Sequence, residues 1–218
     1  MDKKNVVFIL GSPRKKKNTY VFAKSLMKSF EDRGNPTRIF YSIDNFENLT
    51  DKLIGTLRNS HIVCFLCPLY ADYLPYPMIK TMEMILRDQK QVLEGKYLFG
   101  FSQCAFPFWR LNEGSLKAME IFVKQAKMKW LGGLAYGGAG MMDCEDLSEM
   151  GKTGQKLIKG LALCAQAILK GEIIPPEAQK LFEFSIPGIF KRPVGLLLNH
   201  KIKKIEKELG LKIGEKAY

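Results

Sequence analysis

Five short runs of consecutive apolar residues, each followed by a segment with helical spacing, constrain the fold of this chain most strongly. The strands expected from these runs are residues 6–10, 37–41, 62–67, 97–103 and 133–136. The expected helices are residues 18–33, 48–59, 75–88, 113–127 and 148–170. Strands that are apolar throughout are typical of a parallel sheet covered on both faces. The alternation therefore predicts an α/β fold with a doubly wound, five-stranded parallel sheet.

The length of the chain and the number of expected strands narrow the arrangement of the sheet. With 218 residues the chain is too short for an eight-unit barrel, which typically needs about 250 residues. For five strands we expect the order 2-1-3-4-5, in which the winding direction reverses between the first and third strands. Ligands of such sheets bind at the carboxyl ends of these two strands. The segments that follow residues 6–10 and 62–67 are therefore expected to converge on one crevice.

The segment after the first strand is a basic loop, GSPRKKKNT at residues 11–19, that leads into a helix. A loop in this place directs backbone N–H groups and the positive end of a helix dipole toward an anion. The candidate phosphate ligands are Ser12, Arg14, Lys17, Asn18 and Thr19. The loop matches neither the P-loop pattern nor the dinucleotide pattern G-x-G-x-x-G. The alternative interpretation is a basic surface loop without a ligand.

Four motifs occur in order along residues 5–170. They are GSPR with Asn18-Thr19, Pro68-Leu69-Tyr70 followed by Leu74-Pro75 and Ile79-Lys80, Cys104-Ala105-Phe106-Pro107, and the glycine-rich stretch Trp130 to Gly140. Together they resemble the NADPH-dependent FMN reductases, which are flavodoxin-like flavoproteins related to the quinone reductases. The sequence departs from this pattern at Lys17 and Ala105, which stand where the family has glycine.

The resemblance implies a flavodoxin-like fold and an FMN-dependent oxidoreductase, with NAD(P)H as electron donor. The acceptor would be a small molecule such as a quinone, a nitro or azo compound, free flavin or a metal ion, and the protein would form a homodimer. Besides the basic loop, the residues expected to contact the flavin are Pro68, Leu69, Tyr70, Ala71, Asp72, Gln103, Cys104 and Phe106. We expect no catalytic side chain, because a flavin cofactor carries the hydride chemistry itself.

Two other functions are compatible with the same pattern, because a fold alone does not determine function. One is a flavodoxin-type one-electron carrier, and the other is an interaction module that has lost the flavin. The formal net charge of +12 suits a protein that binds anionic FMN and NADPH. It argues against the carrier function, because carrier flavodoxins are typically acidic. We expect no nucleic-acid partner, because the basic residues are not interleaved with aromatic ones and no nucleic-acid motif occurs.

The cysteine pattern raises the question of a redox or metal site. Cys64 and Cys67 have C-x-x-C spacing, but they lie in the apolar run expected to form the third strand. A reactive pair would instead begin a helix, where the dipole activates the thiol. We therefore expect two buried core thiols, and with only two histidines in the chain we expect no metal site.

The chain is expected to divide into a flavodoxin-like FMN-binding domain at residues 1–174 and a basic C-terminal extension at residues 175–218. Within the extension, Leu198, Ile202, Ile205 and Leu209 have the spacing of a tail helix. This helix would pack on its own domain, contact a second copy or lie on an anionic surface. The sequence has no secretory signal and no apolar run long enough to cross a membrane, so we expect a cytoplasmic protein.

Overall fold

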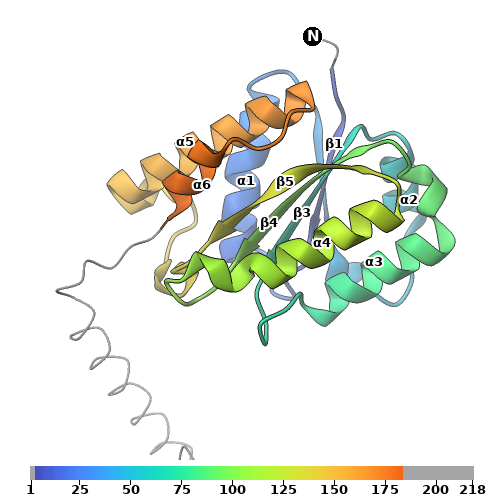
Figure 1. The fold of residues 1–218 in the computed structure, drawn as a ribbon, viewed down its shortest axis with the longest axis horizontal. Coiled ribbons are helices and arrows are strands. Elements are labelled where there is room, and N and C mark those ends of the chain that lie inside the picture. Colours follow the sequence, from blue (N-terminus) through green and yellow to red (C-terminus); the bar gives the residue numbers. More distant parts are fainter. Residues whose placement is uncertain (1–2, 184–218) are drawn as a thin grey trace, which may run out of the picture. The chain divides into compact units, whose positions relative to one another are not determined.

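A computed structural model describes residues 3–183 of the chain. Their five strands form one all-parallel sheet in the order β2-β1-β3-β4-β5 (Figure 1). The strands are β1 (Val6–Leu10), β2 (Thr37–Tyr41), β3 (Ile62–Pro68), β4 (Tyr97–Gln103) and β5 (Lys129–Tyr136). The α-helices are α1 (Asn18–Glu31), α2 (Asp51–Arg58), α3 (Tyr76–Asp88), α4 (Glu113–Gln125), α5 (Gly151–Lys170) and α6 (Pro176–Phe182). The predicted fold class and strand order are confirmed.

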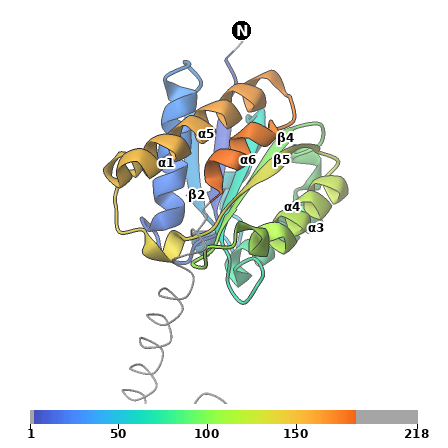
Figure 2. The ribbon, with the colours of Figure 1, turned by 60° about the vertical axis from the view of Figure 1, so that its left-hand side comes forward.

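The helices cover the sheet in two layers, which Figure 2 shows from the side. Helices α1, α5 and α6 pack on one face, and α2, α3 and α4 pack on the other. Strand β1 contributes side chains to the core of both layers, because successive side chains of a strand point to opposite faces. Phe8 lies in the core under α1, whereas Val7 and Ile9 lie in the core under α2 and α3. No helix within residues 3–183 is long and apolar enough to cross a membrane.

The two layers also separate Cys64 from Cys67. Cys64 lies in the core beneath α1 and α5, and Cys67 lies in the core beneath α3. Both side chains are fully buried, and burial raises the pKa of each thiol above its ordinary value. Two thiols on opposite faces of one strand cannot form a disulfide with each other. The prediction of two buried core thiols is confirmed.

Most elements differ from the sequence prediction by one to four residues at one or both ends, and two of these differences have a clear local cause. Strand β5 begins at Lys129 rather than at residue 133, because Lys129 and Trp130 pair with the start of β4 before a β-bulge and the left-handed Gly132 (φ +102°) interrupt the register. Helix α2 begins at Asp51 rather than at residue 48. There Thr50 caps the helix, since its Oγ1 accepts a hydrogen bond from the Leu53 N–H at 3.3 Å.

Helix α6 belongs to the core of the described part. Its Phe182 is 1% exposed and lies among the rings of Phe22, Phe101 and Tyr136, at centroid distances of 6.1, 6.1 and 6.0 Å. Gly160 of α5 allows this approach, because a Cβ there would meet the Phe182 ring at 2.6 Å. The rest of the expected extension, including the tail helix with Leu198 to Leu209, lies outside the described residues, so the division at residue 174 stays a prediction.

The segment around α6 also covers the free edge of β5. The Gln179 side chain pairs with both backbone groups of Ala135: the Ala135 N–H donates to Oε1 at 2.9 Å, and Nε2 donates to the Ala135 carbonyl at 3.0 Å. Nearer the start of the strand, the Ile174 N–H donates to the Leu131 carbonyl at 2.8 Å. A side-chain amide and one backbone group thus occupy hydrogen-bonding positions that a sixth strand would use.

Candidate functional site

The carboxyl ends of the strands open onto a cavity of about 510 Å3. Its walls come from the segments after β1, β3 and β5 and from the last residue of β4, around the point where the winding of the sheet reverses. The sequence-predicted residues that line it are Ser12, Arg14, Lys17, Asn18, Thr19, Pro68, Tyr70 and Gln103. The expected convergence of the loops after β1 and β3 is therefore present.

The N-terminus of α1 forms one wall of this cavity. Within residues 3–183, the backbone N–H groups of Asn18 and Thr19 donate to no protein acceptor. The residue before the helix, Lys17, provides no side-chain cap, and the first turn carries no acidic residue. Unpaired N–H groups and the positive end of the helix dipole therefore meet in the cavity wall, an arrangement that binds anions.

The three predicted side-chain donors near this terminus behave differently. Ser12 donates its hydroxyl proton to the Arg14 carbonyl at 2.8 Å, and Asn18 Nδ2 donates to the Ala139 carbonyl at 2.6 Å. These two side chains hold the surrounding loops together. Thr19 is 2% exposed, and its Oγ1 accepts a hydrogen bond from Gln103 Nε2 at 3.4 Å. Thr19 therefore keeps its hydroxyl proton for a ligand, and Asn18 keeps the second proton of its amide, whereas Ser12 does not keep its own.

Cations of the basic loop complete this wall. Arg14, Lys16 and Lys17 line the cavity, and none of them has a carboxylate within 4.0 Å among the described residues. Lys15 instead pairs with Asp44 at 2.6 Å and does not line the cavity. Lys16 takes the left-handed conformation (φ +57°), whereas Lys17 has φ −113°, which any residue adopts. The loop therefore does not require glycine at position 17.

A second part of the cavity lining was missed by the sequence prediction. It comes from the segment after β5, with Ala139, Gly140, Met142, Asp143, Cys144, Glu145 and Glu149. Ala139 and Gly140 end the glycine-rich motif, but no motif marks the residues that follow them, and only their place after the fifth strand points to this edge of the sheet. Burial raises the pKa of the half-buried Cys144 thiol, and the nearby Glu149 carboxylate raises it further. No group of His, Cys, Asp and Glu within residues 3–183 is arranged to hold a metal ion.

Three predicted residues after β3 do not line the cavity. The Leu69 N–H pairs with the Gln103 carbonyl at 2.7 Å, which extends the contact between β3 and β4. Ala71 and Asp72, with φ of +47° and +59°, form the tip of a two-residue hairpin. Tyr70 and Tyr73 close this hairpin by reciprocal backbone hydrogen bonds of 2.9 and 3.0 Å. The hairpin presents Tyr70 to the cavity and exposes Ala71 and Asp72 at its tip.

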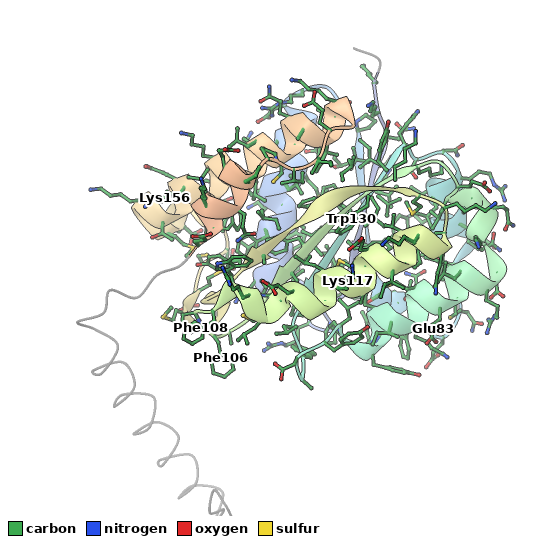
Figure 3. All side chains as sticks on the ribbon, viewed as in Figure 1. Glu83, Phe106, Phe108, Lys117, Trp130 and Lys156 are labelled. Carbon is green, nitrogen blue, oxygen red and sulfur yellow. The ribbon has the colours of Figure 1, made fainter. Side chains whose placement is uncertain are left out.

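The predicted residues after β4, Cys104 and Phe106, also lie outside the cavity wall. Cys104 is 3% exposed, and its thiol donates to the Phe106 carbonyl at 3.3 Å, inside its own loop. Burial raises the pKa of this thiol. Phe106 and Phe108 are 63% and 66% exposed, and Figure 3 shows them together at one end of the described part. The loop therefore contributes an exposed aromatic pair rather than a reactive thiol.

A buried asparagine holds this loop in place. Asn112 is fully buried, and its Nδ2 donates to the carbonyls of Trp109 at 2.9 Å and Tyr136 at 3.3 Å. Its Oδ1 accepts a hydrogen bond from Ser102 Oγ at 2.9 Å. One side chain thus connects β4, β5 and the loop that carries the aromatic pair. Nothing in the sequence pattern distinguishes this asparagine from one on the surface.

No protein-family model and no curated protein matches this chain, but solved structures do. A NADH:FMN oxidoreductase in its apo form matches with a TM-score of 0.56 and 12% identity, over 74% of this chain and 90% of that one. A NADPH-quinone reductase from P. pentosaceus matches with a TM-score of 0.51 and 18% identity, over 75% and 98%. The Streptococcus pneumonia TIGR4 flavodoxin matches with a TM-score of 0.55 and 13% identity, over 76% and 98%. The chain therefore has the flavodoxin-like fold.

Proposed function

We propose that this chain is an FMN-dependent oxidoreductase that accepts hydride from NAD(P)H and passes electrons to a small-molecule acceptor. The observation that carries the proposal is the anion-binding wall of the cavity. It combines the unpaired N–H groups of Asn18 and Thr19, the Thr19 hydroxyl, and the unpaired cations Arg14, Lys16 and Lys17. A phosphate monoester such as that of FMN carries the charge and the acceptor oxygens that these donors require.

The acidic residues that line the cavity favour one orientation of the bound ligand. Asp143, Glu145 and Glu149 face a cavity whose other wall carries Arg14, Lys16 and Lys17. A phosphate is repelled by the carboxylates and attracted by the cations and the helix dipole. The phosphate end of the ligand would therefore lie against α1, and the remainder of the ligand would extend away from it.

The residues beyond the anion-binding wall suit a planar ring. Pro68 and Tyr70 line the cavity, and the exposed pair Phe106 and Phe108 follows β4 at the same edge of the sheet. Aromatic faces and edges favour stacked or edge-on contact with a planar system. When bound, FMN would supply the hydride chemistry. The protein residues bind and orient the cofactor and leave a surface at which a donor and an acceptor can approach.

The structural neighbours include both reductases and a flavodoxin, so the proposal needs a test that separates an enzyme from a carrier. Purified protein is incubated with FMN, freed of excess cofactor and reduced with NADPH in the absence of oxygen. Bound FMN that bleaches, with continued NADPH oxidation once a quinone is added, supports the proposal. FMN that binds but is not reduced indicates a carrier, and absence of flavin binding indicates an interaction module. Homodimerisation and a cytoplasmic location stay predictions.

Two substitutions test the anion-binding wall. Arg14→Ala removes an unpaired cation and Thr19→Ala removes the free hydroxyl donor. A hydrogen bond to a charged group contributes roughly 1.5–3 kcal/mol, so each change should weaken FMN binding about ten- to a hundredfold. Lys15→Ala is the matched control, because Lys15 pairs with Asp44 outside the cavity. Unchanged FMN affinity in both the Arg14→Ala and the Thr19→Ala variant would contradict this placement of the phosphate.

A further inference from the structure

The charged residues of the described part are distributed unequally between the two edges of the sheet. The amino edge comprises the N-terminal segment, the connections that lead into β2 to β5, and the connection between α5 and α6, at residues 3–6, 31–37, 58–62, 88–97, 125–129 and 170–176. It carries nine Lys and Arg against five Asp and Glu. The carboxyl edge, at residues 10–18, 41–51, 68–76, 103–113 and 136–151, carries five Lys and Arg against nine Asp and Glu. The basic edge therefore lies at the opposite end of the strands from the cavity (Figure 1).

The carboxylates of the amino edge all have partners of their own. Four form ion pairs: Asp32 with Lys28 at 3.1 Å, Asp88 with Arg87 at 2.7 Å, Glu94 with Lys127 at 3.3 Å and Glu172 with Lys170 at 3.9 Å. The fifth, Glu31, accepts a hydrogen bond from Thr37. Within residues 3–183, no carboxylate lies within 4.0 Å of the remaining cations, Lys3, Lys4, Arg33, Arg58, Lys90, Lys96 and Lys129. The described part thus leaves these cations of the edge without a countercharge.

Structural roles account for only part of these cations. Lys4 Nζ donates to the Leu169 carbonyl at 2.5 Å, at the end of α5, and Lys96 Nζ donates to a carbonyl at the end of α2 at 3.0 Å. Cations in these places are stabilised by the negative end of the helix dipole. Lys129 lies at no helix end, because it begins β5, and its Nζ lies 5.3 Å from the centroid of the Tyr97 ring. Lys129 therefore adds a charge to this edge that no helix requires.

An apolar side chain projects from the same edge. Ile173 is 76% exposed, in the connection that follows Lys170. The next residue, Ile174, donates its N–H to the Leu131 carbonyl at 2.8 Å, which fixes this connection beside the start of β5, where Lys129 lies. Exposed apolar side chains among unpaired lysines are typical of surfaces that bind the interface of a membrane.

We propose that the amino edge docks on an anionic lipid bilayer, with its unpaired cations at the lipid headgroups and Ile173 in the layer beneath them. The same bilayer repels the carboxyl edge, which has an excess of carboxylates, so the cavity stays open to solution. A single-stranded nucleic acid fits less well, because its bases stack on free aromatic rings. Tyr97 already has the ammonium groups of Lys4 and Lys129 over its ring, at 5.5 and 5.3 Å. The proposal does not depend on whether the cavity binds FMN.

Sedimentation of the full chain with large vesicles tests the proposal. The wild type should bind vesicles of phosphatidylcholine and phosphatidylserine at low salt, dissociate at high salt, and not bind phosphatidylcholine alone. A variant with Lys3→Ala, Lys129→Ala and Lys170→Ala should bind about a hundredfold more weakly, because each cation near an anionic surface contributes about fivefold in affinity. A wild type that does not bind the mixed vesicles overturns the proposal.

A control variant separates this edge from the overall charge of the chain. Lys152→Ala, Lys156→Ala and Lys159→Ala remove the same number of charges from exposed positions in the first half of α5, where Figure 3 shows Lys156. Residues 184–218 are identical in both variants, so any binding by that segment is also identical. The control should keep its affinity within about twofold of the wild type, as expected for charges away from the contact. Equal losses in both variants, or a loss in neither, would overturn the proposal.

The orientation on the bilayer is tested separately. An environment-sensitive dye on position 173, in a chain with Ile173→Cys and Cys144→Ser, should shift its emission to the blue when the mixed vesicles are added. The same dye on Cys144 of the wild type should not shift, because Cys144 lines the cavity at the carboxyl edge. Ile173→Ser should weaken vesicle binding roughly tenfold, whereas Met141→Ser, at a position that is 61% exposed on the carboxyl edge, should not. A shift from Cys144, or none from position 173, contradicts the proposed orientation and with it the proposal.

Discussion

Replacing Phe182 with alanine is expected to lower the free energy of unfolding by about 3–5 kcal/mol. Phe182 is 1% exposed and lies about 6 Å from three other aromatic rings, those of Phe22, Phe101 and Tyr136. A buried phenylalanine removes roughly 200 Å2 from water, which at about 25 cal/mol per Å2 gives an upper estimate near 5 kcal/mol. The cavity left behind adds to the loss only where the three remaining rings cannot close over it.

Urea and thermal unfolding measure this loss. For a domain of this size, about 3–5 kcal/mol corresponds to a decrease in melting temperature of roughly 6–20 °C. Phe106→Ala is the matched control, because the same side chain is removed from a position that is 63% exposed. The control should change stability by no more than about 0.5 kcal/mol. If the Phe182 variant loses no more than this control, α6 does not belong to the core and the reasoning is refuted.

The remaining predictions concern the loops at the carboxyl edge. Asn112→Ala should lower the free energy of unfolding by about 2–5 kcal/mol in urea titrations, because Ser102 and the Trp109 carbonyl lose a buried partner; a loss below about 1 kcal/mol would contradict the role of Asn112. With a thiol reagent, native protein should show one accessible cysteine, Cys144, since the other four are buried. Its pKa is raised by burial and by Glu149, so the thiolate fraction at a given pH is lower than in an exposed cysteine. Labelling should therefore be slow near neutral pH and accelerate with rising pH, and bound FMN should retard it; several fast thiols would be inconsistent with the structure.

The sequence was sufficient for the features that depend on local pattern. Apolar runs such as residues 6–10 and 62–67 identify buried strands, and a polar loop between a strand and a helix identifies the wall built on Thr19. The burial of Cys64 and Cys67 likewise follows from their place in an apolar run that forms a central strand. These inferences need no knowledge of which distant segments meet.

Features that depend on distant contacts were not predictable in the same way. Asp143 and Glu149 line the same cavity as the basic loop only because the segment after β5 lies against the start of α1, where Asn18 donates to the Ala139 carbonyl. Ser12 has the residue type of a phosphate ligand, but its proton goes to a neighbouring carbonyl. Asn112 looks like any polar residue until the three segments that it joins are brought together. Residue type indicates what a group can do, and packing determines which partner it takes.

The amide of Gln179 has a consequence for the behaviour of this protein in concentrated solution. Because it occupies both backbone groups of Ala135, and because Ile174 occupies the Leu131 carbonyl, these positions of β5 cannot template a strand from another molecule. Proteolytic removal of residues 174–183 would expose this edge and leave an apolar patch where Phe182 had been. A clipped chain would then be prone to association by strand addition, so limited proteolysis in this short segment would create an aggregation site that the intact segment covers.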